Sequence, residues 1–214
     1  MKNIIIALSA ILGIFCDALG QQKTEIHGQK YTVVNRTIVA LEETEKKIIR
    51  FTEGEGGGVA WIDDATFAEG TIEFDARGRD EFQRSFVGIA FHGVDYKSYE
   101  AVYFRPFNFN VADKARNAHA VQYIFEPYFT WFVLRKLRYD EFEAPIGIPT
   151  ISKTDWFHAK IEIRNGRIRA FVNGSEKPAL DVAALNDEGK MGNKIGFWVG
   201  GGAVSDFANL KISK

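Results

Sequence analysis

The stretch that decides the fold, residues 155–174, reads DWFHAKIEIRNGRIRAFVNG. Apolar and polar residues alternate over 156–164 and again over 167–172, and the dipeptide Asn165-Gly166 stands between the two runs. Alternation with a period of two is typical of half-buried strands, and Asn-Gly is a preferred pair for a two-residue hairpin turn. The stretch therefore predicts two antiparallel strands joined by a tight turn.

Similar short strand patterns, separated by turn residues, extend through the rest of the chain. They are expected at 31–34, 37–42, 47–52, 71–77, 86–92, 99–105, 120–125, 131–137, 194–199 and 205–212. A glycine-rich break is expected at 54–58, and one helical turn at 183–187. About a dozen strands with no linker between them predict a single all-β domain over 21–214, an antiparallel β-sandwich.

The composition is that of a folded and nearly neutral domain. Hydrophobic residues make up 46% and charged residues 26% of the 214 residues, which is ordinary for a globular protein and excludes a disordered one. Lys and Arg number 27 against 28 Asp and Glu, so the formal net charge is −1. Without an excess of positive charge, no nucleic-acid partner is expected.

The first twenty residues have the features of a signal peptide. Lys2 precedes the apolar stretch Ile4–Phe15, and Ala18-Leu19-Gly20 supplies small residues at a cleavage site. A membrane span needs about 20 apolar residues, so none is expected here. We expect cleavage after Gly20 and a secreted or periplasmic protein without cysteine. Lipidation at Cys16 is less favoured, because the residues before it are not small.

Two segments resemble a known family. The D-W-F-H, N-G and second N-G of 155–174 resemble the hairpin of concanavalin A-like jelly rolls, and Gly196–Val199 followed by Asp206–Ile212 resembles their final strands. The chain is similar in this respect to laminin-G-like domains and to 3-keto-disaccharide hydrolase-like domains of unknown function, over about residues 31–213. The resemblance implies ligands on the concave sheet or its rim. It implies little about chemistry, because this fold hosts lectins, hydrolases and adhesion modules.

The predicted hairpin of 86–92 and 99–105 indicates where a groove could lie. Pairing His92 with Tyr99 makes one face apolar, and the other face mixes small residues with long polar or aromatic ones. That second face carries Gly88, Ala90, His92, Tyr99, Tyr103 and Arg105. Small residues leave room for a ligand and long ones form walls, a pattern that suits a sugar. The alternative is that loops cover this face.

Aromatic residues concentrate between Phe82 and Phe142. Those around Pro127 are expected to form a loop that overhangs the groove, with Trp131 as a stacking platform, although plain loop packing is the alternative. Four polar residues among them are candidates for orienting a ligand: Arg105, Asn108, Gln122 and Arg135.

Catalytic candidates are few. His92 is the histidine expected near the groove, and Glu100 or Asp95 is expected as its partner in general acid/base chemistry. Glu73 and Asp75 share a strand face, similar to the acidic strand of family 16 glycoside hydrolases, but no third acid follows them. We therefore expect those two to lie on a solvated charged face.

The sequence contains no metal-binding motif. Its four histidines show neither H-x-H nor H-E-x-x-H spacing, and there is no EF-hand loop. No metal or other cofactor is expected, with one alternative: a rim calcium held by backbone carbonyls, as the resemblance to laminin-G-like domains allows.

Three functions remain open at this point. The first is carbohydrate recognition by a secreted concanavalin A-like domain. Its expected ligand-binding residues are Tyr99, Tyr103, Arg105, Asn108, Gln122, Trp131 and Arg135. The second, implied by the resemblance, is a glycoside hydrolase or lyase acting on a modified (3-keto) disaccharide through His92 and Glu100. The third is a laminin-G-like module that binds a protein.

Overall fold

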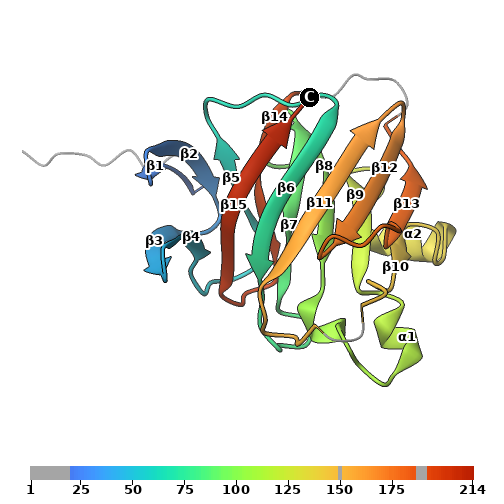
Figure 1. Ribbon diagram of the computed structural model, residues 1–214. Coiled ribbons are helices and arrows are strands. Elements are labelled where there is room, and N and C mark those ends of the chain that lie inside the picture. The colour runs from blue at the N-terminus through green and yellow to red at the C-terminus, as the bar shows by residue number, and fades with distance from the viewer. Residues whose placement is uncertain (1–19, 149–150, 187–191) are drawn as a thin grey trace, which may run out of the picture.

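The computed structural model describes residues 20–148, 151–186 and 192–214. These residues form two antiparallel sheets packed face to face, one of eight strands and one of seven (Figure 1). The all-β sandwich expected from the sequence is confirmed. The expected signal peptide lies, except for Gly20, outside the described residues. No helix in the described ranges is long and apolar enough to cross a membrane.

The two sheets draw their strands from both halves of the chain. The eight-stranded sheet has the order β1 (Gln21–Ile26), β2 (Gln29–Val34), β5 (Gly58–Ile62), β14 (Lys194–Gly200), β7 (Phe86–Gly93), β8 (Tyr99–Phe104), β9 (Val121–Glu126) and β10 (Glu143–Ala144). The seven-stranded sheet has the order β13 (Leu180–Ala183), β12 (Arg167–Val172), β11 (Phe157–Arg164), β6 (Gly70–Arg77), β15 (Ser205–Ser213), β4 (Lys46–Phe51) and β3 (Ile38–Glu43).

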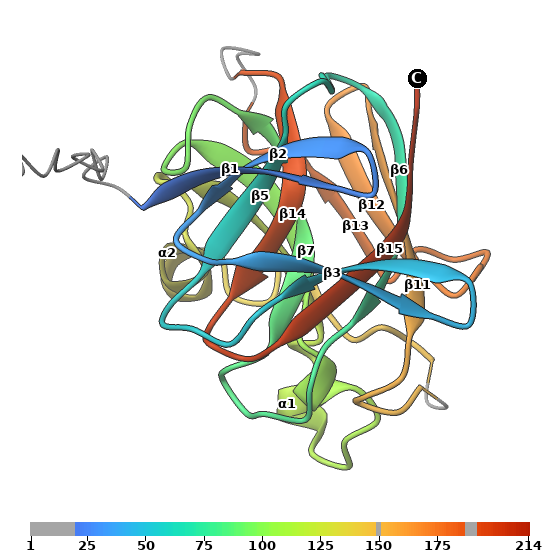
Figure 2. The ribbon, with the colours of Figure 1, turned by 90° about the vertical axis from the view of Figure 1, so that its left-hand side faces the viewer.

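The short helices lie outside the two sheets (Figure 2). They are the 3-10 turn η1 (Pro106–Asn108), α1 (Lys114–Asn117) and α2 (Trp131–Leu137). η1 and α1 lie in the connection from β8 to β9, and α2 lies in the connection from β9 to β10.

The hairpin that decides the fold has the predicted geometry. β11 and β12 pair with Arg164 opposite Arg167, and Asn165 and Gly166 have φ of 52° and 69°. Positive φ at both central residues is the type I′ conformation, whose twist matches that of the strands it joins. Asn and Gly adopt it at little cost, so these two residues fix the register of the hairpin.

The core between the sheets is rich in phenylalanine. Phe197 from the eight-stranded sheet stacks on Phe207 from the seven-stranded one, with ring centroids 4.6 Å apart. Phe51 and Phe74 contact Phe207 at 5.6 and 6.2 Å, and all four side chains are fully buried. Burying one such side chain contributes about 1.5–3 kcal/mol. This cluster holds the two layers together.

Several expected elements differ from the structure. Residues 131–137 form helix α2 and not a strand, because the Thr130 hydroxyl accepts a hydrogen bond from the Val133 N–H and caps a helix there. The expected helical turn at 183–187 is absent over 183–186, since β13 continues to Ala183 and irregular chain follows; residue 187 lies outside the described ranges. The sequence patterns also missed the strands β1, β5, β10 and β13.

Candidate functional site

A row of side chains crosses the outer face of the eight-stranded sheet. Trp198 on β14 lies opposite Gly88 on β7, which lies opposite Tyr103 on β8; the row continues through Gln122 on β9 to Glu143 on β10. The intervening residues of these strands point into the core. The residues of this row therefore lie on the side of the sheet that faces away from the core, and each comes from a different one of five strands.

Gly88 allows the two large rings of this row to meet. A Cβ on Gly88 would lie only 2.6 Å from the Cβ of Tyr103, closer than real carbon atoms approach. Without it, Tyr103 and Trp198 pack over the strand with ring centroids 4.8 Å apart and planes 33° apart. The space that this small residue leaves above the sheet is therefore occupied in part by the rings of its two neighbours.

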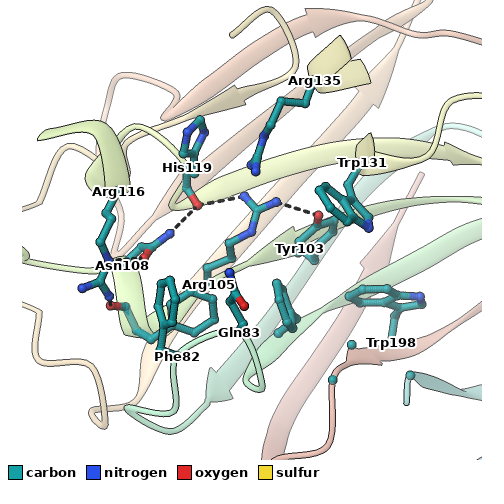
Figure 3. Close-up of a pocket in the computed structure, with 15 residues that line it drawn as sticks. Phe82, Gln83, Tyr103, Arg105, Asn108, Arg116, His119, Trp131, Arg135 and Trp198 are labelled. Atoms are coloured by element: carbon teal, nitrogen blue, oxygen red, sulfur yellow. Dashed lines mark hydrogen bonds between the residues drawn. The ribbon is translucent and has the colours of Figure 1, made fainter. Parts of the chain in front are cut away.

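A pocket of about 530 Å³ opens beside this row (Figure 3). Its lining combines aromatic rings, three arginines and glycines from loops on both sides. The residues are Gly57, Phe82, Gln83, Phe86, Tyr103, Arg105, Phe107, Asn108, Arg116, His119, Trp131, Arg135, Trp198, Gly200 and Gly201. The residues come from β7, β8, β14, α1, α2 and η1, and from connections that include those before β5 and β7. A concave site with aromatic walls and few, fixed polar groups is the usual form of a small-molecule site.

Arg105 is the fixed centre of the pocket. Its guanidinium donates to the backbone carbonyl of His119 at 2.8 Å and to the Tyr103 hydroxyl at 2.9 Å (Figure 3). It also donates to the side-chain oxygen of Gln122 and to Glu143 Oε2, the latter at 3.2 Å. With four acceptors, this side chain is held in one orientation.

Glu143 lies behind the arginines and neutralises part of their charge. Arg135 donates to both of its oxygens, at 3.1 and 2.8 Å. Burial acts to raise the pKa of Glu143, but the hydrogen bond from Arg135 and the charges of Arg105 and Arg135 outweigh it, so the pKa lies below its usual value. Glu143 is therefore a fixed carboxylate. Burial also raises the pKa of Tyr103 to about 12, which keeps its hydroxyl protonated.

Each arginine of the pocket lies over an aromatic ring. Arg105 is 5.0 Å from the ring centroid of Tyr103, Arg116 is 4.6 Å from that of Phe82, and Arg135 is 5.5 Å from that of Trp131. Such cation–π contacts contribute about 0.5–1 kcal/mol at exposed sites and restrain the guanidinium planes. The pocket therefore presents flat apolar surfaces next to planar hydrogen-bond donors.

Most of the ligand-binding residues expected from the sequence lie together here. Tyr103, Arg105, Asn108, Trp131 and Arg135 all line the pocket. Trp131 does so from helix α2, however, and not from the loop that was expected around Pro127. Gln122 is buried directly beneath, where it accepts hydrogen bonds from Tyr103 and Arg105.

Tyr99 lies in a neighbouring hollow of about 290 Å³. Its hydroxyl accepts a hydrogen bond of 3.0 Å from Trp198 Nε1. The second hollow is lined by Val34, Asn35, Gly57, Gly58, Val59, Tyr96, Tyr99 and Trp198. It shares Gly57 and Trp198 with the first pocket, so the two hollows adjoin on one face of the sheet.

His92 does not line the groove as expected. The predicted pairing of β7 and β8 holds as far as Phe91 opposite Glu100, but His92 has φ of 50°, which interrupts the alternation at the strand end. Its ring turns toward Glu100, with Nδ1 2.6 Å from Oε2, and Nε2 lies 2.5 Å from the Ala68 carbonyl. The expected pair forms, but away from the pocket.

Glu100 faces the interior of the sandwich and is 1% exposed. It also accepts hydrogen bonds from the Tyr123 hydroxyl and from Asn186 Nδ2. Burial acts to lower the pKa of His92, but the hydrogen bond and the charge of Glu100 raise it above its usual value. Asp95, the alternative partner, instead accepts hydrogen bonds from the backbone N–H groups of Lys97 and Ser98.

Glu73 and Asp75 lie on the outer face of the other sheet. Asp75 forms an ion pair with Lys46 at 2.7 Å, and His158 Nδ1 lies 2.9 Å from its second oxygen. His158 Nε2 is 3.4 Å from Glu73. This arrangement fits the solvated charged face that was expected for the two acids.

Sequence reasoning missed several lining residues, notably Phe82, Arg116, His119 and Trp198. Arg116 carried a local signal, because Asp113 caps α1 by accepting from the N–H groups of Ala115 and Arg116. Trp198 carried none, since its position beside Tyr103 depends on β14 pairing with β7, more than a hundred residues away in sequence.

Among the described residues, His119, Asp140 and Glu143 offer ligand atoms within 4.8 Å of one another. Both oxygens of Glu143 already accept from Arg135, and Arg105 lies beside them. Two guanidinium groups at this distance repel a divalent cation, so the group does not fit a metal site.

Comparison with known proteins identifies the fold of this chain. No protein-family model matches the sequence, and neither does any curated protein. Among solved structures, a protein of unknown function with a galectin-like fold from Bacillus subtilis aligns with a TM-score of 0.54 at 11% identity, over 85% of this chain and 88% of that one. The carbohydrate-binding module CBM66 from Bacillus subtilis aligns with a TM-score of 0.52 at 15% identity, over 84% and 96%.

The exoplasmic/lumenal domain of VIP36, in its form bound to Ca²⁺ and Man3GlcNAc, aligns with a TM-score of 0.52 at 11% identity, over 84% and 83%. This chain has the concanavalin A-like jelly-roll fold. The fold that the resemblance of residues 155–174 implied is thereby confirmed. At these identities the likeness extends to the fold alone, which is that of a lectin-like sandwich; what the pocket binds has to be argued from its own residues.

Proposed function

We propose that this protein binds carbohydrate in the pocket around Arg105, on the outer face of the eight-stranded sheet. The observation that carries the proposal is the alternation of aromatic faces and planar donors around a single concave site. Sugars present both apolar C–H surfaces and hydroxyl groups, so they suit such a lining. Two structures of the same fold are a carbohydrate-binding module and a domain bound to Man3GlcNAc, which supports the proposal.

The geometry suits binding of a small rigid ligand. A volume of about 530 Å³ is within the roughly 300–1,000 Å³ typical of small-molecule sites. Trp131 and Trp198 offer half-exposed or exposed rings at the pocket wall, and Arg105 is already oriented by its four acceptors. A site that needs little ordering on binding loses less entropy, which favours affinity.

Binding is favoured over hydrolysis by the chemistry of the walls. The described residues that line the pocket include no Asp or Glu, and Glu143 beneath them is held ionised by Arg135. General acid catalysis on a glycosidic bond is most often carried out by a carboxyl group that carries a proton, as one of a pair of carboxyl groups. The hydrolase or lyase hypothesis would have to use His92 and Glu100, which contact each other elsewhere.

The proposal also includes export of the protein from the cytoplasm. Export is inferred from the sequence of residues 1–20, which predicts cleavage after Gly20. N-terminal sequencing of the protein recovered from outside the cytoplasm of its host tests this inference: a chain that begins at Gln21 supports it, and an intact N-terminus contradicts it.

The test of sugar binding compares two neighbouring aromatic residues of α2. Trp131 lines the pocket, whereas Phe132 is 59% exposed and is not among the lining residues. The protein is screened against a panel of neutral and acidic oligosaccharides, and hits are measured by calorimetry. We expect Trp131→Ala to weaken binding of a hit about tenfold or more, as loss of a stacked ring does. Phe132→Ala should retain affinity.

Equal losses for both α2 variants, or no binding to any oligosaccharide of the panel, would contradict the proposal. The comparison is valid when the melting temperatures of both variants are within a few degrees of that of the unmodified protein, which we expect because both side chains are about half exposed.

A further inference from the structure

We infer that the sugar unit bound in the Arg105 pocket carries a negative charge, a carboxylate or a sulfate. This inference rests on the proposed function and specifies its ligand class. Its motivation is the charge of the lining: among the described lining residues are Arg105, Arg116 and Arg135, and none is acidic. For a protein whose formal net charge is −1, that is a strong local excess of positive charge.

The carboxylate behind the pocket compensates only part of this charge. Glu143 accepts from Arg105 at 3.2 Å and from Arg135 at 2.8 and 3.1 Å, so one negative charge serves two guanidinium groups. Asp140, which is exposed, has a carboxylate oxygen within 4.8 Å of those of Glu143. With both acids counted, the arginines of the pocket still outnumber them.

Arg116 is the least compensated of the three. Its guanidinium donates to the Phe107 carbonyl at 2.9 Å and, more weakly, to Asn108 Oδ1 at 3.4 Å, and both acceptors are neutral. The acid nearest in sequence, Asp113, accepts from backbone N–H groups of α1. In the part of the chain that the structure describes, the guanidinium of Arg116 has no carboxylate within 4 Å.

The stacked arrangement favours recognition of a planar or tetrahedral anion. The Arg116 guanidinium lies 4.6 Å from the ring centroid of Phe82, and its two hydrogen bonds use Nε and Nη2, which leaves the N–H groups of Nη1 for a ligand. Arginine edges match the two oxygens of a carboxylate or sulfate, and such charge-assisted hydrogen bonds are about twice as strong as neutral ones. A neutral hydroxyl would leave most of this interaction unused.

The experiment uses pairs of sugars with the same backbone and linkage, in which one member carries the anionic group and the other carries a neutral group in its place. Tetragalacturonate is compared with its methyl-esterified form, and an oligosaccharide of a sulfated galactan with its desulfated form, by calorimetry on the purified protein. The first pair reports on a carboxylate and the second on a sulfate. We expect the anion of at least one pair to bind about tenfold tighter than its neutral partner, the value of one charge-assisted hydrogen bond.

Arg116→Gln tests the residue on which the inference depends. We expect the ratio of the two dissociation constants within the responding pair to fall about tenfold, and Arg116→Lys, which keeps the charge, to retain more of it. Arg167→Gln, on β12 of the other sheet, is the matched control and should leave the ratio unchanged.

Each outcome decides the matter. If neutral sugars bind and their anions bind no tighter, or if Arg116→Gln leaves the ratio unchanged, the inference of an anionic ligand is wrong while sugar binding stands. If none of the four oligosaccharides and no member of the wider panel binds, the proposed function itself fails.

Discussion

At Gly88 one hydrogen atom in place of a side chain lets Tyr103 and Trp198 meet above the sheet. An added Cβ would lie against the Val102 carbonyl oxygen and the Cα and Cβ of Tyr103, none of which can rotate away. We expect Gly88→Ala to lower the free energy of unfolding by about 1–3 kcal/mol, as overpacking does, and to weaken sugar binding. Urea denaturation checks this. Gly54→Ala, whose Cβ would meet only the Arg36 side chain at 3.2 Å, is the milder control, and an equal loss in both would contradict the argument.

The His92–Glu100 pair makes stability depend on pH. Because Glu100 raises the pKa of His92 in the folded state, with a smaller contribution from Glu69, the protonated ring is stabilised by folding. The contribution is fully present below the unfolded pKa of histidine, about 6.5, and is lost as the pH rises through the higher folded value. We therefore expect the unfolding free energy of the protein, relative to that of His92→Gln, to be larger at pH 6 than at pH 9. A difference that does not change between those pH values would show that folding leaves the pKa of His92 where it is in the unfolded chain, which would contradict the prediction.

At the scale of single elements, local patterns predicted what local contacts decide. The hairpin of β11 and β12 and the register of β7 with β8 follow from alternation and turn residues, since each pair is adjacent in sequence. Residues 131–137 were misread because Trp131, Phe132 and Val133 look like a strand, while the Thr130 cap and the following Leu134, Arg135 and Lys136 favour a helix.

The candidate site shows the same division between local and distant contacts. Tyr103 and Arg105 were correctly predicted to lie on one face because they are two residues apart in a hairpin that the sequence pattern indicates. Trp198 and Arg116 were not, because β14 and α1 reach the pocket through the sheet order and a long connection. A single sequence records neither of these. His92 was misplaced for a different reason: its positive φ at the strand end reverses the side chain, and alternation does not reveal it.

The sandwich as a whole separates its two outer faces by chemistry. The outer face of the seven-stranded sheet is tied by ion pairs, such as those of the buried Asp206 with Arg50 and Arg77. The outer face of the eight-stranded sheet instead carries both hollows, with Trp198 and Gly57 between them. A ligand chain that passes Trp198 would enter the second hollow beside Tyr96 and Tyr99.

This arrangement predicts that affinity increases with ligand length. We expect a disaccharide or trisaccharide to bind at least about tenfold tighter than the monosaccharide of the same type. The second sugar unit adds contacts, whereas the translational and rotational entropy of the ligand is lost only once. Tyr96→Ala should remove much of this gain and leave the monosaccharide affinity as it was, since Tyr96 lines only the second hollow. Tyr128→Ala, at an exposed ring that lines neither hollow, is the control. Calorimetry over a length series decides the point: equal affinity for one unit and for three would confine recognition to the Arg105 pocket, and the second hollow would then have no part in binding.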